Sequence, residues 1–333
     1  MSTLFTGFRR TFIFNPRLLF IVAAIGLLWF ALRSVSPGEI WRLFQQLNPA
    51  KFWLLVGVNG LLLLVFGSRW WLFLMALGHR LPYLALARYR LAAFGVSYFT
   101  PGPHFGGEPL QVYLLQQRHG ITTADAVASV TLDKTFDLLF NFIFLCIGFL
   151  LVLAQMPNAG FSASAAPYAF IAATLPLGLL IATASGRRPV STTIRAFRRY
   201  AAWGQSVYDL AYSSESQMIG VCQRQPWALW AATLLSLLTW LMLIGEFWLA
   251  TYVLGLNLSL VQAIFIMVAA RVAILLPMPA GLGALEAGLV LAVGMLGLDP
   301  AVGISLGILI RGRDILVGLV GLWLASLDVS KVA

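Results

Sequence analysis

Uninterrupted apolar segments recur along this chain, and most are at least about 20 residues long, the length an α-helix needs to cross a bilayer. Strands of a membrane β-barrel would instead alternate in polarity over about ten residues. The pattern therefore predicts an all-α polytopic membrane protein, a single integral membrane domain over 1–333. Six segments are expected to be full transmembrane helices: 18–34, 52–77, 126–154, 166–185, 227–254 and 300–327.

Two further apolar regions, 84–118 and 260–297, are interrupted near the middle by proline and glycine. The arm from Pro109 to Arg118 is ten residues long, which as a helix spans roughly 15 Å, half a bilayer. We therefore predict that both regions are re-entrant helical hairpins. Ordinary kinked transmembrane helices are the alternative, because such helices tolerate proline and glycine.

The two interrupted regions resemble each other, which indicates an internal repeat. Each tip has a Pro-x-Pro pair, then two glycines, then a glutamate: Pro101, Pro103, Gly106, Gly107 and Glu108, and later Pro277, Pro279, Gly281, Gly283 and Glu286. An aspartate follows each glutamate by 29 or 28 residues, and a basic residue stands three positions before each aspartate. The repeat units are predicted to be 52–154 and 227–327, each a span, a hairpin and a span.

Composition excludes a soluble enzyme and a disordered chain. Only 10% of the residues are charged and 60% are hydrophobic, whereas a soluble domain carries about 25% charged residues. The net charge of +10 comes from Lys and Arg that flank apolar segments. That distribution is typical of membrane orientation signals, so no nucleic-acid partner is expected.

The same charges predict an orientation in the plasma (inner) membrane. The positive-inside rule places the N-terminus in the cytoplasm, with Arg9, Arg10 and Arg17. The basic segment 186–226 is then a cytoplasmic loop, the C-terminus is cytoplasmic, and 37–48 is a short amphipathic helix on the outer surface. In this arrangement the two repeat units are inverted copies, a design typical of transporters with broken helices.

Charged residues inside the apolar regions are the candidate functional residues, because each needs a partner or a wet cavity. Lys134 and Asp137, like Arg311 and Asp314, share a helix face, so local structural pairing is one interpretation. Glu108 and Glu286 each open the second arm of a hairpin, where they either cap free N–H groups or bind a head group. The predicted substrate-binding residues are Glu108, Asp133, Lys134, Asp137, Arg271, Glu286, Arg311, Arg313 and Asp314.

No cofactor or metal is expected. The chain has only three histidines, His79, His104 and His119, and their spacing does not complete a metal site with Glu108. Cys146 and Cys222 provide neither a disulfide framework nor a ligand set. Nucleotide-binding and hydrolase motifs are missing, so the sequence does not indicate ATP-driven transport.

These motifs resemble a known family. The resemblance rests on Gly106-Gly107-Glu108-x4-Tyr113-Leu114-Leu115, Ala128-Ser129-Val130-x2-Asp133-Lys134-x2-Asp137-Leu138-Leu139, Pro277-x-Pro279-x-Gly281-Leu282-Gly283-x2-Glu286 and Arg313-Asp314. Over about 15–330 the chain is similar to the flippase-like membrane region of lysylphosphatidylglycerol synthases. In bifunctional members this region moves aminoacylated phosphatidylglycerol between leaflets, and a separate soluble domain makes that lipid. We expect no lysyl transfer here, and Lys134 stands where relatives often have Arg.

The sequence therefore favours a lipid translocase whose substrate has a polar, anionic or aminoacylated head group. A membrane-embedded enzyme that modifies a lipid is one alternative, with Glu108 or Asp137 as general base. A membrane partner of a separate lipid synthase, docked through the basic loop, is another. A homo-oligomer is also compatible with the sequence.

Overall fold

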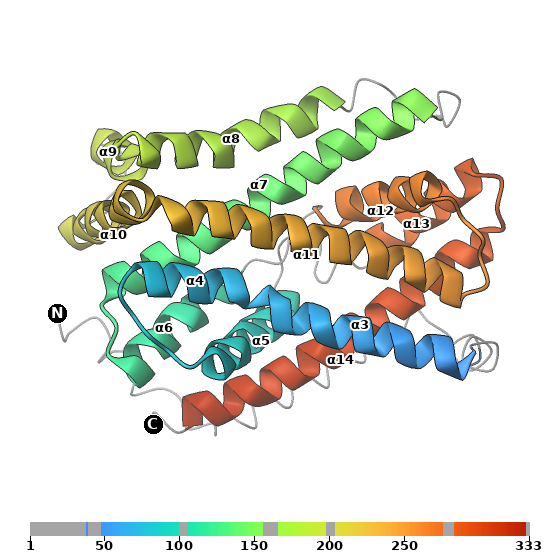
Figure 1. Ribbon diagram of the computed structural model, residues 1–333, viewed down its shortest axis with the longest axis horizontal. Helices are drawn as coiled ribbons and strands as arrows, with labels where there is room; N and C mark the ends of the chain where they lie inside the picture. The colour runs from blue at the N-terminus through green and yellow to red at the C-terminus, as the bar shows by residue number, and fades with distance from the viewer. Residues whose placement is uncertain are drawn as a thin grey trace.

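The computed structural model describes residues 38, 48–99, 106–155, 166–197, 204–275 and 283–330, and within these ranges every regular element is a helix. Figure 1 shows the long helices running along the molecule, with shorter ones between them. The elements are α3 (Pro49–Phe66), α4 (Ser68–Ala76), α5 (Tyr83–Phe99), α6 (Glu108–His119), α7 (Thr123–Gln155), α8 (Ala166–Ala184), α9 (Pro189–Phe197), α10 (Gln205–Arg224), α11 (Pro226–Val253), α12 (Leu260–Ile274), α13 (Ala284–Met295) and α14 (Pro300–Ser330).

Three helical stretches in the described chain are long and apolar enough to cross a membrane: Pro49–Ala76, Thr123–Ala154 and Pro226–Val253. A fourth is counted if α8 and α9, bent by 104° at a short break, form one span. α14 has 31 residues but carries Arg311, Arg313 and Asp314 near its middle. The predicted span 18–34 lies outside the described residues, so the integral membrane class is supported and the count of six is not reached.

The predicted span 52–77 corresponds to one apolar stretch, Pro49–Ala76, with a turn at Gly67 between α3 and α4. The Gly67 Cα lies against α5, where an added Cβ would be 3.4 Å from the Tyr83 hydroxyl. The Ser68 hydroxyl donates a hydrogen bond to the Val65 carbonyl at 2.6 Å and so links the end of α3 to the start of α4. As a result Arg69 lies in the first turn of α4.

Both interrupted regions form pairs of short helices. α6 and α13 each have 12 residues, about 18 Å of helix. In Figure 1, α5 and α6 lie in the left half of the molecule, and α12 and α13 lie in the right half. The tip residues Pro101, Pro103, Pro277, Pro279 and Gly281 lie outside the described residues.

The segment predicted as a basic loop, 186–226, contains two helices, α9 and α10. Glu215 of α10 holds the first turn of α9, because its carboxylate accepts the Val190 N–H at 2.6 Å and the Ser191 N–H at 2.9 Å. The charge pattern revealed the basic character of this segment, but the helices depend on packing against α7 and α8. The predicted surface helix 37–48 lies almost wholly outside the described residues.

Glycines allow α5 and α14 to approach closely. A Cβ added at Gly95 would lie 2.6 Å from the Gly318 carbonyl oxygen and 2.7 Å from the Leu322 nitrogen. At Gly321 an added Cβ would collide with the Leu91 carbonyl oxygen. Small residues at helix interfaces are typical of membrane proteins, where close backbone contact drives association.

Replacing Gly95 with Leu is expected to destabilise the protein by about 1–3 kcal/mol or more, because the contacting atoms are backbone and cannot move aside. The measurement is the thermal unfolding midpoint of the purified protein in detergent. Gly60→Leu on α3 is the matched control, since an added Cβ there meets nothing within 4 Å. Equal midpoints for the two variants would contradict the close packing of α5 on α14.

Candidate functional site

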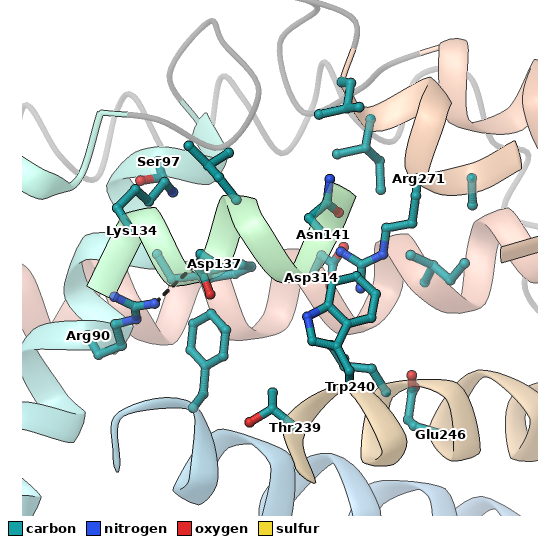
Figure 2. Close-up of a pocket in the computed structure, with 18 of the residues that line it drawn as sticks. Arg90, Ser97, Lys134, Asp137, Asn141, Thr239, Trp240, Glu246, Arg271 and Asp314 are labelled. Atoms are coloured by element: carbon teal, nitrogen blue, oxygen red, sulfur yellow. Dashed lines mark hydrogen bonds and ion pairs between the residues drawn. The ribbon is translucent and has the colours of Figure 1, made fainter. Parts of the chain in front are cut away.

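Nine charged side chains of the described chain line a cavity of about 330 Å³. Its walls come from α3 to α7 and from α11 to α14, so both pairs of short helices contribute (Figure 2). Apolar side chains such as Phe94 and Leu243 separate the polar groups. The charged lining residues are Arg69, Arg90, Glu108, Lys134, Asp137, Glu246, Arg271, Arg313 and Asp314.

Two aspartates of α7 and two arginines form the first charge cluster. Arg69 donates to Asp133 at 2.7 Å and to Asp137 at 2.5 Å, and a third donor of Arg69 reaches Ser236 of α11 at 2.9 Å. Arg90 of α5 pairs with the same two carboxylates. Asp133 is fully buried. Since the charges cancel and the lone pairs are occupied, the cluster is stable as a unit but intolerant of losing one member.

Each tip glutamate has the same two kinds of partner. Glu108 accepts the Gly106 N–H at 2.8 Å and pairs with Lys134 at 3.0 Å. Glu286 accepts the Gly283 N–H at 3.0 Å and pairs with Arg311 of α14. The interpretation of the two glutamates as groups that accept backbone N–H bonds is therefore confirmed, and each glutamate also pairs with a cation of the long helix. Each pair ties a hairpin to the long helix that follows it.

The glycine donors of these tips have backbone conformations that other residues rarely adopt. Gly106 has φ 132° and Gly283 has φ 78°, and glycine reaches such angles without steric cost. At Gly107 an added Cβ would collide with the Ala93 carbonyl oxygen of α5. Gly106, Gly107 and Gly283 are thus required by the backbone geometry and close packing of the described tip residues.

Another group of charged side chains joins α11 and α14. Arg313 donates to Glu246 at 3.0 Å and to Asp314 at 2.8 Å. Asn59 of α3 also donates to Glu246, at 3.2 Å. Arg313 thus pairs with two carboxylates, Glu246 and Asp314.

Arg271 is the exception among the lining cations. Its guanidinium lies over the Trp240 ring, with 4.9 Å between the guanidinium carbon and the ring centroid. Figure 2 shows the side chain pointing from α12 into the cavity toward Trp240. No carboxylate of the described chain lies within ion-pair distance of Arg271.

The structure brings most of the predicted site residues together. Glu108, Lys134, Asp137, Arg271, Arg313 and Asp314 line the cavity. Asp133 lies behind the wall in the α7 cluster, and Glu286 and Arg311 pair with each other beside the lining residues Leu285 and Ile310. Local pairing along one helix did not identify the main partners, because Lys134 and Arg311 pair with the tip glutamates.

The sequence did not place Arg90 or Trp240 in the site, and it marked Arg69 and Glu246 only as intramembrane charges without a substrate-binding role. Arg69 and Glu246 had a signal, since a charge within an apolar span indicates an internal partner. Trp240 had one too, because it stands in the middle of a span and tryptophan is typical of span ends. Pairing partners more than forty residues apart could not be chosen from spacing.

Most of the chain matches a known protein family. Residues 17–321 match the family described as the lysylphosphatidylglycerol synthase TM region. The chain belongs to this family. Membership agrees with the resemblance of the tip motifs, and it makes the chain a membrane protein of lipid metabolism.

A curated relative of this family member is a UPF0104 membrane protein from Methanothermobacter thermautotrophicus. The two are 27% identical over 113 residues, which is 34% of this chain and 33% of that protein. The matched part is thus about a third of the relative's length. The likeness supports the membrane class and carries nothing about substrate.

Proposed function

We propose that the protein is a lipid translocase that moves a polar-headed lipid between the leaflets. The head group passes through the charged cavity, and the acyl chains remain in the hydrocarbon. The observation that carries this proposal is a cavity of about 330 Å³ with nine charged lining residues inside a bundle of apolar helices. Such charges are costly in a membrane interior and are typical of a substrate pathway.

The same order of helices in the two repeat units supports the proposal. Units 52–154 and 227–327 each consist of a span, two short helices and a long helix. Each unit forms the same ion pair between its tip glutamate and its long helix, Glu108 with Lys134 and Glu286 with Arg311. With the N- and C-termini in the cytoplasm of a plasma-membrane protein, the hairpins enter from opposite sides, as in alternating-access transporters.

The charges have distinct roles in this mechanism. Four cations, Lys134, Arg271, Arg311 and Arg313, balance the anionic part of a head group. Asp133, Asp137 and Asp314 hold those cations in place. Glu108 and Glu286 tie the hairpin tips to α7 and α14. Release of one tip pair at a time would open the cavity to one leaflet while the other pair keeps the opposite side closed.

The test is a translocation assay in proteoliposomes with fluorescent phosphatidylglycerol and a membrane-impermeant quencher. Glu108→Gln is expected to slow translocation at least about tenfold, because the neutral amide no longer pairs with Lys134 across 3.0 Å. Asp299→Asn, an exposed change, is the control. Equal rates for Glu108→Gln and wild type would contradict the role of Glu108.

Mass spectrometry of the recovered lipids separates translocation from lipid chemistry. We expect the lipid mass to stay unchanged while its leaflet changes. A new lipid mass that depends on Glu108 or Asp137 would instead indicate a membrane-embedded lipid-modifying enzyme.

A further inference from the structure

One cation in the cavity differs from all the others. Arg69, Arg90, Lys134 and Arg313 each pair with at least one carboxylate. Arg271 pairs with none among the described residues, and its guanidinium is over Trp240. A guanidinium with no carboxylate within ion-pair distance is less stabilised than a paired one. The protein retains this charge where a ligand can reach it, because Arg271 lines the cavity.

The long helices of the two repeat units differ in their acidic residues. In the first unit, Asp133 and Asp137 of α7 hold the arginine of the hairpin arm, Arg90. Aligning the long helices by Lys134 and Arg311 places Ile310 where the first unit has Asp133.

The other aspartate of the second unit is also occupied. Asp314, which corresponds to Asp137, accepts from Arg313 at 2.8 Å. In the second unit, Ile310 therefore stands in place of the first carboxylate, and the second carboxylate, Asp314, is paired with Arg313. This part of the cavity therefore combines the Arg271 guanidinium, the face of the Trp240 ring and open space.

We propose that Arg271, supported by Trp240, forms the subsite for the phosphate group of the transported lipid. This assignment rests on the proposed translocase function for the lipid nature of the ligand. Guanidinium binds phosphate through two parallel N–H donors. The Trp240 face fixes the guanidinium plane by cation–π contact and leaves its edge to the ligand. Asn141 lines the same part of the cavity and provides an amide.

The experiment measures ligand-dependent thermal unfolding of the purified full chain in detergent. The probes are short-chain phosphatidic acid, short-chain phosphatidylglycerol, diacylglycerol with the same chains, and inorganic phosphate. We expect the two phospholipids to raise the unfolding midpoint of wild type and diacylglycerol to leave it unchanged. Arg271→Gln is expected to weaken the apparent phospholipid affinity at least about tenfold, as loss of a charge-assisted pair does.

Two further variants define the subsite. Arg271→Lys keeps the charge and loses the paired donors, so an intermediate affinity is expected. Arg195→Gln, an exposed arginine of α9, has the same change of charge away from the cavity and is the matched control. Without lipid, Arg271→Gln is expected to unfold at or above the wild-type midpoint, since it removes a charge that has no anionic partner in the described chain.

Each outcome decides the assignment. A phospholipid shift that persists in Arg271→Gln, or an equal shift with diacylglycerol, would overturn it. An Arg271-dependent shift with inorganic phosphate and none with phospholipid would overturn the lipid as the source of the phosphate. The unfolding assay has no transport step, so it tests the subsite separately from translocation. Phospholipid binding that depends on Arg271, in a protein that does not translocate lipid, would contradict the translocase proposal alone. Translocation by a protein whose phospholipid binding does not depend on Arg271 would contradict the subsite alone.

Discussion

Replacing Asp133 with Asn is expected to lower the free energy of unfolding by about 3–5 kcal/mol. Asp133 is fully buried, and it accepts from both Arg69 and Arg90. The amide would leave two guanidinium groups in the interior with Asp137 as their remaining carboxylate partner. We expect the thermal unfolding midpoint in detergent to fall by about 10 °C, following the usual relation between free energy and midpoint.

The control for this prediction is Asp209→Asn, an exposed aspartate of α10 for which we expect no measurable change. Asp133→Asn combined with Arg90→Gln should recover part of the lost stability, because the double variant removes one unpaired charge. An Asp133→Asn protein as stable as wild type would mean that the α7 cluster does not hold α4 and α5 in place.

Filling the cavity is expected to stop translocation while leaving the fold intact. Thr239 of α11 lines the cavity, so the indole of Thr239→Trp would occupy space that the head group needs. We expect the proteoliposome rate to fall at least about tenfold, comparable to the loss of a key catalytic or binding contact. The unfolding midpoint should change little, because the added ring enters empty space and not packed core.

Leu237→Trp is the matched control for the cavity. It lies two residues away on the same helix and is 48% exposed on the outside of the bundle. The control should translocate lipid at the wild-type rate. A Thr239→Trp protein that is stable and equally active would show that the head group does not pass through this cavity.

Spacing in the sequence was enough to find the tip glutamates and the basic residues that follow them. The repeated motif marked Glu108 with Lys134, and Glu286 with Arg311, as equivalent sets. It did not say that each glutamate pairs with the basic residue 26 or 25 positions later, because helix periodicity identifies only neighbours on one helix. The α7 cluster was less accessible still, since Arg69 lies 64 residues from Asp133.

The sequence by itself determined the membrane class, the two interrupted helical regions and the residue types at their tips. These properties follow from local rules: apolar length sets the spans, and proline and glycine set the breaks. Only the tertiary structure decided which charges meet. Ion pairing depends on where helices distant in sequence cross, and those crossings are fixed by close contacts such as Gly95 of α5 on α14. For the same reason only the tertiary structure distinguished Arg271 from the paired arginines around it, since no carboxylate of the described chain lies within ion-pair distance of Arg271.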